Sequence, residues 1–208
     1  GDGFVEGEGA AYEITGTQTV VGESENEFTY TLNEGTLAEN YTIETVNGTL
    51  KVTKTTKTLT IESGSNSWMY DGAEHSEPTY TVTFGSGEDA ETGTATKNED
   101  GSYSYKLSTG DVITITDIVT VKNVGDTKAE NNSFTYALTN ADQYADVSTT
   151  FGTLTITARS ITMTSADGSK EYDGTPLTKN EQTDVTVTGD GFVEGEGAAY
   201  DITGTQTV

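Results

Sequence analysis

Acidic pairs in predicted turns are the residues of this 208-residue chain with the clearest potential for metal chemistry. Asp89 stands close to Glu91, and Glu99 is next to Asp100, in segments rich in Gly and Thr. Because Ca²⁺ takes roughly six to eight oxygen ligands, such turns could contribute to a calcium site. Neither pair has the spacing of an EF-hand loop, and acidic turn residues also keep a protein soluble. Calcium binding and plain solvated charge therefore both stay open.

Trp68 and Tyr70 are the candidate residues for binding an organic ligand. Trp68 is the only tryptophan, and Tyr70 opens the Tyr70-Asp71-Gly72 turn that follows it. Exposed Trp and Tyr rings have an apolar face that can stack on sugars, which makes a carbohydrate-binding platform one interpretation. The alternative is that aromatic residues at alternate strand positions pack in a core or along its rim.

Catalytic residues are scarce, and we predict that the chain is not an enzyme. His75 is the only histidine, and its polar surroundings are typical of a surface loop rather than of a Ser/His/Asp triad. Glu6 and Glu8 form a carboxylate pair in a Gly-rich loop, where solvated charge is far more common than acid–base catalysis. We expect no cofactor apart from the calcium considered above.

The composition excludes several other classes of function. The formal net charge is -24 with only ten Lys and Arg residues, so binding to nucleic-acid phosphates is not expected. No stretch approaches the roughly twenty apolar residues that span a bilayer, so no membrane insertion is expected. Cysteine is absent, which excludes disulfides and thiolate metal sites.

The elements that position these residues are predicted to be β-strands. Apolar residues alternate with threonine in residues 28–32, 112–116 and 154–156, which is the pattern of half-buried strands in antiparallel sheets. Asn-Gly and Asp-Gly pairs between such segments indicate tight turns. No segment has a convincing helical period, since the nearest candidate, residues 123–133, is polar on nearly all sides. We therefore predict an all-β protein with little helix.

Internal repeats define the expected domains. Residues 1–20 return as residues 189–208 with Glu13 replaced by Asp201 as the only change, which gives a period of 188 residues. Each period contains two related modules, which open with a Tyr-Asp-Gly turn and close with a Gly-Thr-Leu-x-Val/Ile-Thr strand. The predicted organisation is the C-terminal part of module A in residues 1–56, the complete module B in 57–160, and the N-terminal part of the next module A in 161–208.

The junctions between modules predict a stiff rod. Residues 52–61 and 154–163 pass from one predicted strand into the next without Gly or Pro, so they lack the composition of a flexible linker. Basic residues gather partly at these junctions, at Lys51, Lys54, Lys57 and Arg159. They could meet carboxylates of the neighbouring module, or they could be solvated and keep strand ends from pairing.

The module motifs resemble a known class of repeats. The Tyr-Asp-Gly turn, the segment Asn40-Tyr41-Thr42-Ile43 and the closing strand are similar to the tandem MBG/YDG-type or bacterial Ig-like repeats of Gram-positive cell-surface adhesins. The resemblance implies an elongated tandem array of small antiparallel β-sandwich modules, with a β-grasp-like variant as the alternative. It also implies a stalk that projects a binding region from the bacterial cell wall, or alternatively an adhesive module that binds a host glycan or glycoprotein.

Two further expectations accompany this resemblance. Related modules sometimes carry a Lys-to-Asn isopeptide crosslink, for which Lys106, set among tyrosines, is the candidate, although a lysine with its amine in water is the alternative. The predicted partners are neighbouring repeats of the same protein. Chains could associate end to end, with the tail of one chain exchanging strands with the head of the next. The alternative is that this sequence is an arbitrary window on a longer polymer of repeats.

Overall fold

The computed structural model describes residues 1–203 and 205–206, and strands dominate them. The helical segments of this described part are short 3-10 turns, so the predictions of an all-β fold and of little helix are confirmed. These turns are η1 (Ala38–Asn40), η2 (Gly87–Asp89), η3 (Val124–Asp126), η4 (Ala141–Gln143) and η5 (Gln182–Asp184).

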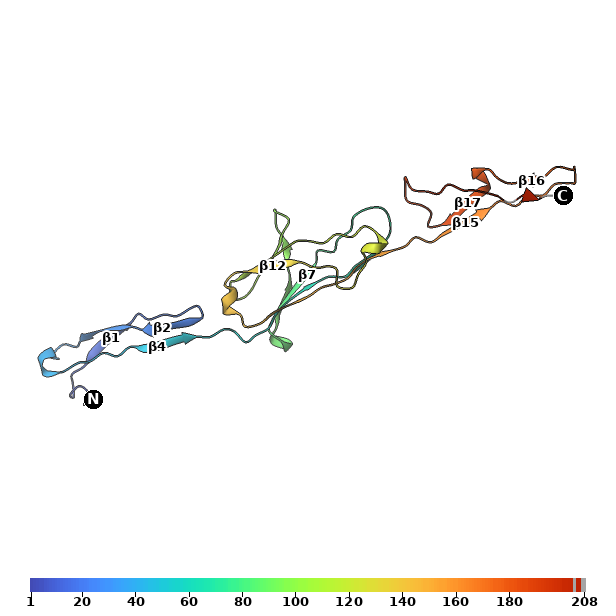
Figure 1. The fold of residues 1–208 in the computed structure, drawn as a ribbon. Coiled ribbons are helices and arrows are strands. Elements are labelled where there is room, and N and C mark those ends of the chain that lie inside the picture. The colour runs from blue at the N-terminus through green and yellow to red at the C-terminus, as the bar shows by residue number, and fades with distance from the viewer. Residues whose placement is uncertain (204, 207–208) are drawn as a thin grey trace.

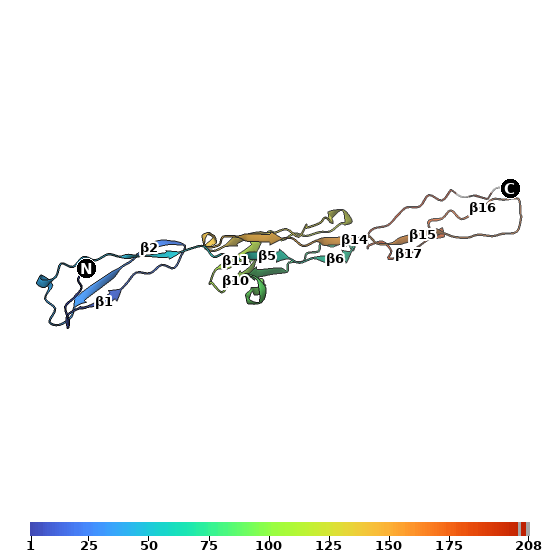
Figure 2. The ribbon, with the colours of Figure 1, turned by 90° about the horizontal axis from the view of Figure 1, so that it is seen from below.

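The chain is extended, with three units arranged in line (Figures 1 and 2). The strands between residues 10 and 52 form an N-terminal unit at one end, those between 59 and 157 form a central unit, and those between 161 and 206 form a C-terminal unit at the other end. The solvent-accessible surface is 14084 Å². A compact globule of the same mass would expose only about 9,300 Å², so the surface reflects the elongated shape.

The central unit contains two four-stranded sheets. In the first, the strand order is β13 (Val147–Thr150), β5 (Leu59–Ser63), β7 (Tyr80–Phe84) and β8 (Glu91–Thr94). In the second, the order is β12 (Thr135–Leu138), β11 (Val112–Thr116), β10 (Tyr103–Lys106) and β9 (Thr96–Lys97). Ala95, between β8 and β9, is the point at which the chain passes from the first sheet to the second.

The core of the central unit draws on both sheets. Ile61 of β5, Val82 of β7, and Ile113 and Ile115 of β11 are completely buried, while the threonines between them lie on the outer faces or at the edge of the core. This is the arrangement that the period-two pattern predicts. Aromatic rings complete the cluster, with Tyr80 packing edge-on at 5.3 Å between ring centroids against both Tyr103 and Phe134.

Two strand pairs are parallel, which the sequence pattern does not predict. β13 runs parallel to β5, and β14 (Leu154–Thr157) runs parallel to β6 (Asn66–Met69). The strands that open the central unit therefore lie beside the strands that close it. Strand periodicity cannot reveal such pairing, because the paired residues are almost ninety positions apart and alternate in the same way in either direction.

The N-terminal and C-terminal units contain only two-stranded sheets. The N-terminal unit pairs β1 (Ala10–Ile14) with β3 (Phe28–Leu32) and β2 (Gly22–Asn26) with β4 (Gly48–Val52). The C-terminal unit pairs β15 (Ile161–Ser165) with β17 (Val185–Gly189) and β16 (Leu177–Thr178) with β18 (Thr205–Gln206).

Neither end unit has a core comparable to that of the central unit. Among the residues with described burial, every buried hydrophobic side chain lies between Leu59 and Ile156. Large hydrophobic residues in the end units stay exposed instead, for example Tyr12 at 63% and Met163 at 48%. Two-stranded ribbons of this kind are only marginally stable alone.

Candidate interface at the module lock and the junctions

A buried cluster joins the opening and closing halves of the central unit, and we call its residues Ser63, Gly64, Asn132 and Gly152 the module lock. Asn132 is fully buried, and its Nδ2 donates to the carbonyl oxygens of Gly64 and Glu77, both at 2.8 Å. The Ser63 hydroxyl donates to the Asn132 carbonyl at 2.6 Å and accepts from the Gly152 amide at 2.9 Å. Hydrogen bonds thus connect four backbone segments at this point.

Gly152 is required by the close approach of two backbones in the lock. A Cβ at this position would lie 2.0 Å from the Gly64 oxygen and 2.4 Å from the Gly64 carbonyl carbon. Both of these are backbone atoms that no side-chain rotation can move away. Gly152 also bridges Asn132, because the Asn132 amide donates to the Gly152 oxygen at 3.0 Å. Glycine here lets the closing strand lie directly against the opening one.

A second polar network lies around Asp111, near the N-terminal end of the central unit. The Tyr144 hydroxyl donates to Asp111 Oδ2 at 2.7 Å, and Asn140 Nδ2 donates to Oδ1 at 2.7 Å. The hydrogen bond from Tyr144, with others from Asn140, Thr109 and Thr139, lowers the pKa of the Asp111 carboxyl. Burial, together with the adjacent Asp111 carboxylate, raises the pKa of Tyr144 to about 12.

The first junction is held by backbone hydrogen bonds to this region. The Thr55 amide donates to the Gln143 carbonyl at 2.9 Å, and the Ala145 amide donates to the Thr55 carbonyl at 3.3 Å. Thr55 therefore forms a parallel bridge with Tyr144, although it lies in the connection between two units. The Val21 amide also donates to the side chain of Gln143, which connects the N-terminal unit directly to the central one.

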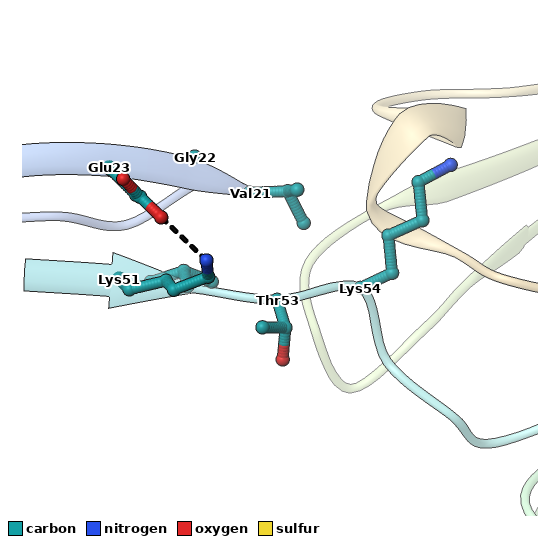
Figure 3. Close-up of a pocket in the computed structure, with 7 residues that line it drawn as sticks. Val21, Gly22, Glu23, Lys51, Thr53 and Lys54 are labelled. Carbon is teal, nitrogen blue, oxygen red and sulfur yellow. Dashed lines mark hydrogen bonds and ion pairs between the residues drawn. The ribbon is translucent and has the colours of Figure 1, made fainter.

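A shallow, open hollow of about 520 Å³ lies beside this junction, between the ends of β2 and β4 (Figure 3). Lys51 and Glu23 point toward each other across it and form an ion pair at 2.5 Å, while Lys54 points away (Figure 3). Lys51 thus pairs within its own unit rather than with a neighbouring one. Lys57 lies over the Phe84 ring, 5.4 Å from its centroid.

The second junction depends on Arg159, whose partners are carbonyls rather than the carboxylates considered from the sequence. Its Nη1 donates to Tyr70 O at 3.1 Å in the central unit, and its Nε donates to Gly191 O at 2.7 Å in the C-terminal unit. Its Nη2 donates to the carbonyl of Asp190. The Asp190 carboxylate accepts from the Ser160 amide at 2.7 Å. One planar guanidinium therefore bridges two units.

The predicted ligand platform is partly covered. Trp68 is half-buried and stacks on the His75 ring, with 4.9 Å between centroids and 17° between the planes. His75 Nε2 lies 2.9 Å from Asp71 Oδ1. Trp68 and Tyr70 both pack against a small core of Val121, Leu154 and Ile156. The structure thus joins Trp68, Tyr70 and His75 in one packed cluster of the central unit.

The predicted calcium residues lie in different elements: Asp89 ends η2, Glu91 begins β8, and Glu99 and Asp100 lie in the turn between β9 and β10. Glu91 accepts from the Ser108 amide and the Tyr105 hydroxyl, each at 3.1 Å. The Ser108 side chain contributes most to lowering the pKa of Glu91, and these two hydrogen bonds add to the effect. Asp100 accepts from the Ser102 hydroxyl at 2.6 Å, which likewise lowers its pKa. Asp89 and Glu99 are exposed. In the described part of the chain, no group of three or more His, Asp or Glu side chains could hold a metal ion together.

Lys106 is exposed at the end of β10, where its backbone is opposite Val112 of β11. The side chain of this predicted crosslink residue is therefore not enclosed in an apolar pocket. The isopeptide bond stays a prediction that intact mass would test.

The comparisons with known proteins identify no relative, since no protein-family model, curated protein or solved structure matches the chain. The similarity to adhesin repeats accordingly rests on the short motifs alone. Within residues 1–203 and 205–206, we find no helix with the length and apolar character needed to cross a bilayer.

The module lock and the Asp111 network were not among the candidate sites of the sequence analysis. One signal for the lock is present in the sequence: Asn26 and Asn132 each stand two residues before a Phe-Thr-Tyr segment, and each strand is followed by a Gly-Thr-Leu segment. The Asp111 network has no comparable signal, because its members are spread over loops.

Proposed function

We propose that this chain is a structural repeat of a bacterial surface stalk or fibre, built as a tandem array of small β-sandwich modules. In this role the chain sets a distance from the cell surface and catalyses no reaction. In this proposal the array lies outside the cell, attached to the cell wall, and carries a binding region away from the surface.

The observation that carries the proposal is the fixing of both junctions. At the first junction, Thr55 and Val21 both hydrogen-bond to the central unit, and at the second, Arg159 hydrogen-bonds to the units on either side of it. Neither connection therefore resembles a free linker. Support also comes from the near-identical sequence repeat, the in-line arrangement of the units and the two sheets that share one core (Figure 2). The stacking of Trp68 on His75 gives the alternative role of a glycan-binding module less support, since one face of the indole is already covered.

Small-angle X-ray scattering at low protein concentration tests the spacer role. A compact chain of this length would have a radius of gyration of about 17 Å. We expect a clearly larger value and a distance distribution typical of a rod. A variant with a Gly-Ser insertion at residue 56 should broaden that distribution, whereas the same insertion between the exposed turn residues Glu99 and Asp100 should not. A compact particle, or a rod unaffected by the junction insertion, would count against the proposal.

A further inference from the structure

The Tyr70-Asp71-Gly72 turn of the central unit meets the acidic loop of residues 189–197 at the second junction. The Tyr70 hydroxyl donates to the carboxylate of Glu196 in that loop. The Tyr70 carbonyl accepts from Arg159, which also donates to the loop at Gly191 O. The turn and the loop are therefore in contact through a side chain as well as through the guanidinium described above.

The other two residues of the turn shape it for this contact. The Asp71 carboxylate accepts from the Ala73 amide at 2.9 Å, and this hydrogen bond contributes most to lowering the pKa of Asp71. Such a bond from an Asp side chain to the backbone two residues on fixes a turn. Gly72 has a φ of +78°, and a Cβ there would lie 3.2 Å from Val193 Cγ1. Glycine therefore allows both the turn and the close approach of the loop valine.

The acidic loop occurs twice in the chain, with one sequence and one conformation. Residues 1–9 and 189–197 are identical, so Glu8 is the counterpart of Glu196. The Glu8 amide donates to the carbonyl three residues before it at 3.0 Å, and the Glu196 amide does the same at 2.9 Å. The glycine before each glutamate has a φ of +90° in the first copy and +85° in the second. The loop therefore keeps the same shape in two different surroundings.

In the first copy, the glutamate of the loop binds a tyrosine of its own unit. The Tyr41 hydroxyl donates to Glu8 Oε2 at 2.5 Å and accepts from the Val5 amide at 3.2 Å. The hydrogen bond to Glu8 raises the pKa of Tyr41, just as the one to Glu196 raises the pKa of Tyr70. One loop is thus held by two different tyrosines, one from its own module and one from the module before it.

We propose that in the tandem array the glutamate of this loop accepts both hydroxyls at once, so that a Tyr–Glu–Tyr bridge joins each module B to the module A that follows it. This inference rests on the proposed array, in which every such loop has a module B before it and the Tyr41 segment of its own module after it. A carboxylate has two oxygens with about four lone-pair positions, enough to accept from Tyr70 and from a further copy of Tyr41. The Tyr-Asp-Gly turn of module B is then a docking surface whose partner is the acidic loop of the next module.

Hydrogen exchange of the Glu8 and Glu196 amides, followed by NMR, tests the contact in the chain itself. In Tyr70→Phe the Glu196 amide should exchange about fivefold faster, which is the factor that the loss of one typical hydrogen bond implies. The Glu8 amide is the matched internal control and should not change. Tyr41→Phe should have the reverse effect, with faster exchange at Glu8 alone. Phenylalanine keeps the aromatic ring, so near-UV circular dichroism should show an unchanged fold in both variants.

A lengthened chain, in which residues 21–56 follow Val208 a second time, distinguishes a bridge from a competition between the two tyrosines. It brings a further copy of Tyr41 to the loop that contains Glu196. If one carboxylate accepts both hydroxyls, Tyr70→Phe in the lengthened chain still speeds exchange of the Glu196 amide about fivefold. If the further copy of Tyr41 displaces Tyr70, the same substitution has no effect there, and the proposal is overturned.

The bridge and the spacer role fail through different results. Equal exchange of the Glu196 amide in the wild type and in Tyr70→Phe would overturn the bridge, because the turn and the loop would then not be joined through this hydroxyl in solution. A rod in X-ray scattering would leave the spacer role intact in that case, since Thr55 and Arg159 hold the junctions without the Tyr70 hydroxyl. A compact particle in scattering would instead refute the spacer role, whatever the exchange rates show.

Discussion

Gly152→Ala is the substitution whose effect the structure defines best. The added methyl group would lie 2.0 Å from the Gly64 oxygen, where ordinary contact begins at 3.4 Å. The closing strand must therefore move by more than an ångström. Such a movement would break the 2.9 Å hydrogen bond from the Gly152 amide to Ser63 Oγ, and it would strain the Asn132 bridge.

The destabilisation is the sum of two effects, the steric clash at residue 152 and the lost hydrogen bond to Ser63. Overpacking of a rigid site costs about 1–3 kcal/mol, and each lost hydrogen bond adds about 1 kcal/mol. We therefore expect Gly152→Ala to lower the free energy of unfolding of the central unit by about 2–4 kcal/mol. For a unit of about one hundred residues, this corresponds to a fall in melting temperature on the order of 15 °C.

The assay is thermal and urea unfolding followed by near-UV circular dichroism, which reports the buried tyrosines of the central unit. Gly125→Ala is the matched control, because a Cβ there meets no atom within 4 Å and the glycine has no positive φ. A Gly152→Ala protein that unfolds within about 1 kcal/mol of the wild type would refute the reasoning, since the backbone contact would then be much looser than the lock requires.

Four other predictions follow from the same structure. Asn132→Ala removes the donor of two partly buried carbonyls and leaves a cavity at a fully buried position, so it should cost about 2–4 kcal/mol in urea unfolding. Tyr144→Phe should destabilise strongly at pH 7 but progressively less as the pH falls below 3.8, because the lowered pKa of Asp111 gives stability only while its carboxylate is ionised. The wild type should in addition lose stability between pH 10 and 12, because in this range the Tyr144 phenol ionises in the unfolded chain but stays neutral in the folded one. The Tyr144→Phe variant should not show this loss in pH-dependent urea titrations. Arg159→Lys, which keeps the charge but not the planar fork, should speed amide hydrogen exchange at the second junction several-fold without lowering the central melting temperature. EDTA should leave the melting temperature unchanged, because Glu91 already accepts hydrogen bonds from Ser108 and Tyr105, and Asp100 accepts one from Ser102, and a fall of several degrees would favour calcium.

The sequence predicts the local structure of this chain better than its long-range pairing. Alternation of apolar residues with threonine predicts the strands around Ile61 and Ile113 and the direction of their side chains, because both depend on a period of two. The parallel partners of β5 and β6 cannot be predicted in this way. They are set by packing between segments almost ninety residues apart, and no turn motif marks them.

For the candidate sites as well, the sequence identifies individual residues but does not predict their long-range contacts. Trp68 and His75 are singled out by their rarity, but only coordinates show that their rings stack on each other. Gly152 is visible as part of a repeated closing motif, yet its role depends on the Gly64 backbone lying against it. The domain boundaries at residues 56/57 and 160/161 remain predictions, although both fall in the junctions that Thr55 and Arg159 stabilise.

The two parallel strand pairs bear on how the central unit would respond to a pulling force. Tension along the rod would enter through β5 and leave through β14, and these strands belong to two continuous lines, β5–β6 and β13–β14, that lie side by side along the long axis (Figure 2). Such a load shears the lines past each other, so their transverse hydrogen bonds must fail together rather than one at a time. The unit should therefore resist stretching far more than it would if the same strands were peeled apart from one end.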